Sequence, residues 1–197
     1  MAAGKSNRMR AGRAFHSLAC LTLLLLSVRV VHAQEGVFLS EADAPGAVFP
    51  LADRFERTEI PSSDALKQRM RVELGSTTPS IWEVSYPTFL AWQGQTLLGR
   101  AFFVEEIGKH RPITFVIGIR TDGSIADVAV IAYREAYGGE IRSKRFLKQF
   151  EGKKQDDSLQ RDRGIVNIAG STLSVDAAAR ACKKALALAK ATEAGQP

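Results

Sequence analysis

Residues 112–135 read PITFVIGIRTDGSIADVAVIAYRE, and this stretch decides the fold. Two apolar runs, 112–120 and 124–135, are rich in β-branched residues and flank the tripeptide Thr121-Asp122-Gly123. A short Asp-Gly turn between two such runs is typical of a β-hairpin. The stretch therefore predicts two neighbouring antiparallel strands.

Two more strands are predicted on the N-terminal side of this hairpin. Residues 81–92 alternate around Trp82, Val84 and Tyr86, and residues 96–106 form a second apolar run after a turn at 93–95. Residues 81–135 are thus expected to form an antiparallel meander of four strands.

Two helices are predicted before the meander in the chain. Residues 61–75 have apolar positions at helical spacing, with Ser62 or Ser63 as the N-cap and Gly75 as the end. A short helix starting near Ser40 is expected to stop at Pro45 and Gly46.

The C-terminal part of the chain adds two further helices and a strand. Residues 142–150 predict a short helix that buries Phe146, Leu147 and Phe150, and residues 165–172 predict a strand. A long last helix is expected from about Ser174. Its apolar face comprises Val175, Ala178, Ala179, Cys182, Ala185, Leu186 and Ala189. The expected fold class is α+β, a mainly antiparallel sheet with helices packed on it.

The first 33 residues have the pattern of a secretory signal peptide. A basic start precedes the apolar run 14–28, and Val31 and Ala33 occupy the small-residue positions of a cleavage site. A membrane anchor is the weaker alternative, because a span needs about 20 apolar residues. We expect an exported, periplasmic protein, in solution or at the membrane. Its parts are the signal peptide 1–33, an N-terminal part of the domain 34–94 and the domain core 95–197.

Charge and cysteine content exclude several function classes. The whole chain has a formal net charge of +6, with 27 Lys and Arg against 21 Asp and Glu. Five of the basic residues lie in 1–33, so the remainder is nearly neutral and no nucleic-acid partner is expected. After residue 33 the chain has one histidine, His110, and one cysteine, Cys182, which excludes an internal disulfide and a His/Cys metal site. No catalytic residue is predicted; His110 is interpreted as a surface residue and Cys182 as a core residue.

Residues 170–174, GSTLS, place a glycine and three hydroxyls at the start of the last helix. Ser and Thr are common helix caps, and this is the simpler interpretation. The unpaired N–H groups and dipole of a helix start also stabilise a phosphate. Asp176, expected in the first turn, argues mildly against an anion. From the residues alone, capping is favoured and a phosphate site stays open.

Three motifs in the same order resemble the FMN-binding domain family. VNIAGSTLS (166–174) is similar to its S-G-A-T-x-T/S signature. Residues 108–141 resemble the family's hairpin and following Gly-Gly loop, and RFLKQFEGK (145–153) resembles the end of its short helix. Together the motifs cover roughly residues 95–190. The family occurs in the G subunit of the Rnf electron-transport complex and in the C subunit of sodium-translocating NADH:quinone reductase.

The resemblance implies FMN as the cofactor, esterified through its phosphate to Thr172 by a flavin transferase. It implies that Arg134 stabilises the reduced flavin and that Tyr137 stacks on the ring. Without it, Arg134, Tyr137 and Lys153 are interpreted as a solvated charge, a half-buried aromatic and a surface lysine. The implied cofactor-binding residues are Thr172, Gly170, Ser171, Leu173, Ser174, Arg134, Glu135, Tyr137, Gly139 and Lys153.

Two departures from the signature bear on attachment. The family usually has an acidic residue six places before the threonine and a hydroxyl three places before it, where this chain has Val166 and Ala169. The implied function is an electron-transfer module between membrane or periplasmic redox partners, with no substrate of its own. The alternative is a non-redox binding or scaffold module that keeps the fold without covalent flavin.

Overall fold

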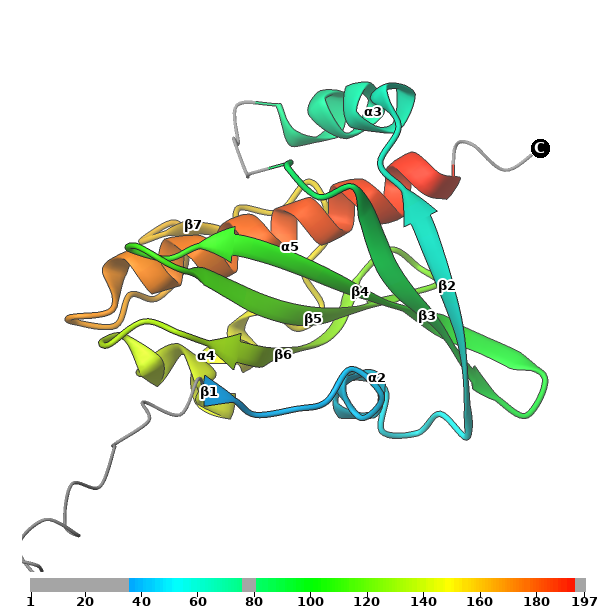
Figure 1. Cartoon of the computed structure of the whole chain (residues 1–197), viewed down its shortest axis with the longest axis horizontal. Coiled ribbons are helices and arrows are strands. Elements are labelled where there is room, and N and C mark those ends of the chain that lie inside the picture. The colour runs from blue at the N-terminus through cyan, green and yellow to red at the C-terminus, as the bar shows by residue number, and fades with distance from the viewer. Residues whose placement is uncertain (1–35, 76–80, 194–197) are drawn as a thin grey trace, which may run out of the picture. The chain divides into compact units, whose positions relative to one another are not determined.

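The computed structural model of the protein describes residues 36–75 and 81–193 (Figure 1). The predicted signal peptide lies outside these described residues. Within them, no helix combines the length and apolar character needed to cross a membrane.

A six-stranded antiparallel sheet forms the centre of the described fold. Its order is β1-β6-β5-β4-β3-β2. The predicted four-strand meander is confirmed, with the first strand starting at Ser85 rather than at residue 81. The strands are β1 (Gly36–Val37), β2 (Arg54–Pro61), β3 (Ser85–Gln93), β4 (Thr96–Ile107), β5 (Pro112–Arg120) and β6 (Ile125–Tyr133).

Helices cover both faces of the sheet (Figure 1). The long helix α5 (Thr172–Glu193) lies across one face and is itself covered by α3 (Asp64–Leu74). The short helix α2 (Ala44–Val48) covers the other face against β5 and β6. This arrangement confirms the predicted α+β class.

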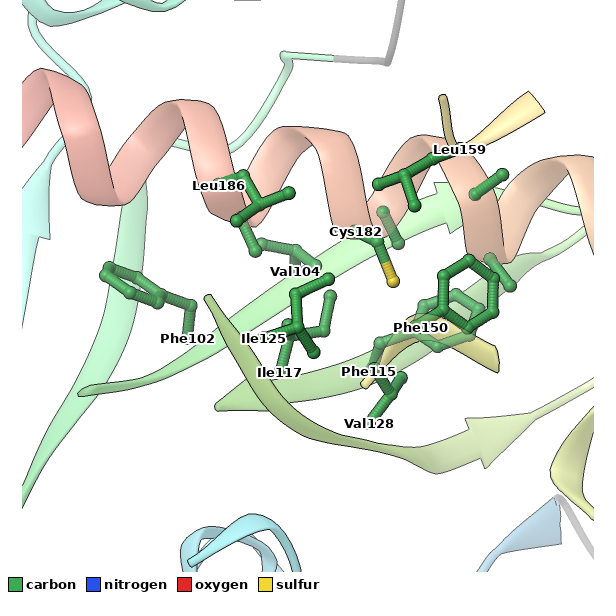
Figure 2. Close-up of a cluster of buried hydrophobic side chains, with 14 of the residues drawn as sticks. Phe102, Val104, Phe115, Ile117, Ile125, Val128, Phe150, Leu159, Cys182 and Leu186 are labelled. Carbon is green, nitrogen blue, oxygen red and sulfur yellow. The ribbon is translucent and has the colours of Figure 1, made fainter. Parts of the chain in front are cut away.

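The larger core lies between α5 and the sheet. Figure 2 shows Cys182 and Leu186 of α5 directed towards Val104 and Ile117 of the strands. Burial of a large apolar side chain stabilises the fold by about 1.5–3 kcal/mol each. The predicted apolar face of α5 is buried throughout, and Cys182 is a fully buried core residue as expected.

Of the two helices predicted from their capping residues, α3 begins where its cap predicted and α2 does not. The α3 prediction is confirmed: the Ser63 hydroxyl accepts a hydrogen bond from the Leu66 N–H, and Gly75 follows the last turn. The prediction for Ser40 was wrong, because α2 begins at Ala44 and continues through Pro45 and Gly46. Proline lacks only an N–H that the first helical turn leaves unpaired, so it starts α2 instead of ending it.

The segment 139–150 forms a chain of short helical turns, namely η2 (Gly139–Arg142), α4 (Lys144–Leu147) and η3 (Lys148–Phe150). Phe146, Leu147 and Phe150 are buried, as predicted.

The strand predicted over 165–172 was wrong. Only β8 (Gly164–Ile165) is a strand, paired in parallel with β7 (Gln160–Arg161). The edge strand beside β6 is β1, where Gly36 lies opposite Tyr133, and residues 166–169 are not part of the described sheet. The Val166 N–H instead donates to the side-chain oxygen of Gln149.

Candidate functional site

The glycine motif forms a tight turn that leads directly into α5. The Ser171 N–H donates to the Ile168 carbonyl at 3.0 Å, and Gly170 has φ +82°, a left-handed backbone that favours glycine. No atom lies within 4 Å of the position that a Cβ on Gly170 would take, so this side of the turn is open. The helix begins at Thr172, two residues earlier than predicted. The unpaired N–H groups of the first helical turn are therefore those of Thr172 and of the residues directly after it.

The three hydroxyls of the motif have different surroundings. Ser171 is 2% exposed and its hydroxyl donates to the Glu140 carboxylate at 2.8 Å. Ser174 is 5% exposed and its hydroxyl is 2.8 Å from the Tyr133 hydroxyl. Thr172, between them, is only half-buried. Among these three residues, Thr172 is thus the accessible one.

A tyrosine holds the loop 134–139 against the start of α5. The Tyr133 hydroxyl donates to the Tyr137 carbonyl as well as bonding to Ser174. Gly138 has φ +88°, and a Cβ there would lie 2.7 Å from both the Ser174 and the Tyr133 hydroxyl oxygens. We call this arrangement of Tyr133, Tyr137, Gly138 and Ser174 the loop clasp. Burial raises the pKa of Tyr133, so its hydroxyl stays a donor over the ordinary pH range.

The carboxylates near the helix start form an ion pair or a hydrogen bond within the fold. Asp176 lies in the second turn, not the first as expected, and pairs with Arg161 at 3.0 Å. The pKa of Glu140 is held below its ordinary value by its own backbone N–H and by the Ser171 hydroxyl. The mild argument from Asp176 against an anion is thereby weakened.

A pocket of about 790 Å³ adjoins the motif, between the 139–150 turns and the segment 166–169. Sequence reasoning did not assign it, because its walls come from segments that meet only in the fold. Val166 and Ala169, the two departures from the signature, both line it. The remaining lining residues are Glu140, Ser143, Arg145, Phe146, Gln149, Asn167 and Ile168. Such a mixture of apolar walls and a few polar groups suits a flat ring system.

The structure brings some of the predicted residues together and leaves others apart. Gly170, Ser171, Thr172, Leu173 and Ser174 form the helix start, and the loop clasp brings Tyr137 and Gly139 beside them. Tyr137 is 84% exposed, so its side chain is accessible to a ligand or a partner.

Arg134 and Glu135 are the first two residues of the same loop, and they contact Thr114 of β5 and the turn between β4 and β5. Arg134 donates to the Thr114 hydroxyl at 3.4 Å. The Glu135 carboxylate accepts from the N–H groups of His110 and Arg111, in the exposed turn between β4 and β5. Burial alone would raise the pKa of Glu135, but these N–H groups lower it overall.

Lys153 does not share this surface. Its carbonyl accepts from the Ile125 N–H, at the start of β6, whereas the loop clasp lies at the end of β6. The strand has nine residues, and its eight steps of about 3.3 Å separate the two ends by roughly 26 Å.

The fold and the site define a small α+β domain that presents a glycine turn, an accessible hydroxyl and a helix start to a ligand beside an apolar pocket. The model of the FMN-binding domain matches residues 108–187, from the turn before β5 into α5. This match confirms the family that the three motifs indicated, and FMN is the cofactor of this domain. No curated protein matches the chain.

The local chemistry fits this cofactor. The open side of Gly170 leaves room beside the backbone, the first N–H groups of α5 favour a phosphate, and the lining of the pocket reaches Ala169, the residue before Gly170. Among the described residues, no group of His, Cys, Asp and Glu side chains could hold a metal ion.

Proposed function

We propose that this protein is an exported flavoprotein that carries FMN on Thr172 through a phosphoester and transfers electrons between redox partners. The observation that supports the attachment site is the contrast between the three hydroxyls of the motif. Ser171 and Ser174 are buried and hydrogen-bonded within the fold, and Thr172 is accessible at the first position of α5.

Each part of the site has a role in this proposal. Thr172 contributes the hydroxyl oxygen of the ester, and the N–H groups that follow it bind phosphate oxygens. Gly170 keeps the approach to the backbone open. The pocket lined by Phe146, Val166 and Ile168 offers apolar walls to the ring. Bound FMN supplies the redox chemistry, and the chain supplies position and electrostatics.

Covalent attachment suits a protein that leaves the cytoplasm, because an ester cannot be lost by dissociation. The reaction needs an activated donor, such as a flavin dinucleotide, and a flavin transferase as partner. The accessible Thr172 hydroxyl is the acceptor. A nucleoside monophosphate carries away the other half of the donor's phosphoanhydride.

The test is co-expression with a flavin transferase in a host that exports the protein. Trypsin releases the peptide 164–180, which contains Thr172, and this peptide should gain the mass of FMN less one water. Thr172→Val should abolish the gain, and Ser171→Ala, the matched control, should retain it. Attachment to Thr172→Val at the wild-type level would refute the assigned residue.

The alternative is a binding or scaffold module without covalent flavin. Its supporting observation is that Val166, 71% exposed at the rim of the pocket, replaces the family's usual acidic residue. Absence of the mass gain in the wild-type protein, with a transferase proven active on another acceptor, would favour this alternative.

A further inference from the structure

The strand β2 leaves one edge of the sheet open. It pairs with β3 on one side, and within residues 36–75 and 81–193 no strand lies on its other side (Figure 1). β2 has eight residues, whereas β1 at the opposite edge has two. An edge of this length presents a row of backbone N–H and C=O groups with which a further strand can pair.

The odd-numbered residues of β2 direct their backbone groups to this open edge. The Ser62 N–H, directly after β2, donates to the carbonyl of Val84, which lies opposite it when the β2–β3 register is continued by one residue. Such hydrogen-bonded positions recur at every second residue of an antiparallel pair, so the even-numbered residues bond to β3. Pro61 agrees, because a proline in a strand places its missing N–H at an edge. The outward-facing residues are Phe55, Arg57, Glu59 and Pro61.

The charges of β2 restrict how a second copy can pair with it. Two identical antiparallel strands are related by a two-fold axis, so one residue lies opposite itself and residues at equal steps from it face one another. With Glu56, Arg57 or Glu59 on the axis, like charges would lie directly opposite, which destabilises the pair. An axis nearer either end would pair at most three residues of β2. With Thr58 on the axis, residues 55–61 pair and no like charges are opposite.

This register places Arg57 of each copy opposite Glu59 of the other. The two side chains share one face of the strand, where Arg57 lies 3.4 Å from Glu59 of its own chain. Arg57 also donates to Glu41 at 2.9 Å, and the Ser85 hydroxyl donates to Glu59, so both side chains are already oriented. Exposed ion pairs contribute little by themselves. They select the register, and the backbone hydrogen bonds supply the attraction.

We infer that β2 pairs with β2 of a second copy of this chain, antiparallel around Thr58, and joins the two sheets edge to edge. Arg57 and Glu59 exchange backbone hydrogen bonds across the join, and the Phe55 N–H donates to the Pro61 carbonyl of the second copy. A contact along one strand is small, so we expect a dissociation constant of about 10 μM.

The join leaves the candidate site free. Tyr133 of the loop clasp lies at the end of β6, four strands from β2. Strands lie about 4.8 Å apart, which separates the two by roughly 19 Å across the sheet. Flavin-free Thr172→Val should therefore dimerise as the wild type does, and the inference stands whether or not Thr172 carries FMN.

Sedimentation equilibrium of complementary charge variants tests the pairing. Arg57→Glu alone and Glu59→Arg alone each place like charges opposite one another, so each should weaken the dimer at least tenfold. An equimolar mixture of the two variants restores opposite charges and should form a heterodimer about as tight as the wild-type dimer. Arg71→Glu and Asp156→Arg make the same changes of net charge at exposed positions outside β2. These controls should dimerise as the wild type does.

A disulfide cross-link tests the register. Residues on the axis at a non-hydrogen-bonded position have Cα atoms about 4.5 Å apart, within the range of a disulfide. In a Cys20→Ser background, Thr58→Cys should give a covalent dimer when oxidised glutathione accepts the electrons and protons of the two thiols. Glu56→Cys, on the same face of β2, is the control and should stay uncrosslinked, because its two copies are about 13 Å apart along the strands. Cys182 is fully buried and does not compete.

Two results would overturn the inference. One is a wild-type protein that stays monomeric up to about 1 mM. The other is a cross-link through Glu56→Cys in place of Thr58→Cys, which would mean a different register. Heterodimer formation together with the Thr58→Cys cross-link would establish the join.

Discussion

Replacing Gly138 by alanine tests the loop clasp. The backbone cost of a left-handed non-glycine residue is about 1–2 kcal/mol. The added methyl would also lie 2.7 Å from two hydroxyl oxygens and force the Tyr133–Ser174 hydrogen bond apart. Loss of a buried hydrogen bond costs about 1–3 kcal/mol, so Gly138→Ala should lower the free energy of unfolding by about 2–5 kcal/mol.

A second glycine provides the matched control. Gly123 has φ +77°, close to that of Gly138, but no atom lies within 4 Å of the Cβ it would gain. Gly123→Ala therefore carries the backbone cost alone. Urea unfolding of both variants, followed by circular dichroism, gives the contact cost as the difference of the two losses.

A change of background checks the cause of that difference. In a protein that already carries Tyr133→Phe and Ser174→Ala, the atoms that clash with the new methyl are absent. There Gly138→Ala should cost no more than Gly123→Ala. Equal losses for the two glycine variants in the wild-type background would refute the clasp.

Two further predictions concern charged groups. Lys184 is fully buried, and its ammonium contacts the carboxylates of Glu83 and Glu106. Lys184→Met should therefore lower the free energy of unfolding, measured in urea, by about 3–5 kcal/mol. A decrease under about 1 kcal/mol would contradict this prediction. Hydrogen bonds from the Ser124 hydroxyl and N–H lower the pKa of Asp122 from 3.8 to about 2. Its stabilisation is therefore complete above pH 3.8 and is lost as the pH falls through about 2. The difference in urea midpoint between wild type and Asp122→Asn should shrink over that range, and a constant difference down to pH 2 would contradict the assignment.

The parts of the fold that could be predicted are those whose signals are local. The hairpin at 112–135 carries its own turn, and α3 carries its own cap in Ser63. β2 was missed because it is an edge strand with exposed charges such as Arg57 and Glu59, so its alternation of apolar residues is weak. Edge strands are often protected in this way. Residues 166–169 look like a strand in sequence, but the Val166 N–H bonds to the Gln149 side chain and the Ser171 N–H to the Ile168 carbonyl, so the segment forms a turn into α5.

The candidate site also has parts that could be predicted from the sequence and parts that could not. The helix start and its hydroxyls could be predicted from residues 170–174, since glycine and the caps act on their neighbours. The contacts that distinguish the hydroxyls could not: Ser171 meets Glu140 and Ser174 meets Tyr133, partners 31 and 41 residues away. The pocket likewise depends on segments brought together by the fold.

If Thr172 carries FMN, as proposed, its position on α5 has a consequence for electron transfer. This helix has 22 residues, about 33 Å of continuous backbone, and is packed on the sheet along its length. A redox group fixed to its first residue would share the stiffness of the whole core. Small displacements of the group mean little reorganisation energy and a narrow spread of tunnelling distances to a docked acceptor. The domain would thus hold its redox group in a fixed position, and donor and acceptor proteins would bind and leave in turn.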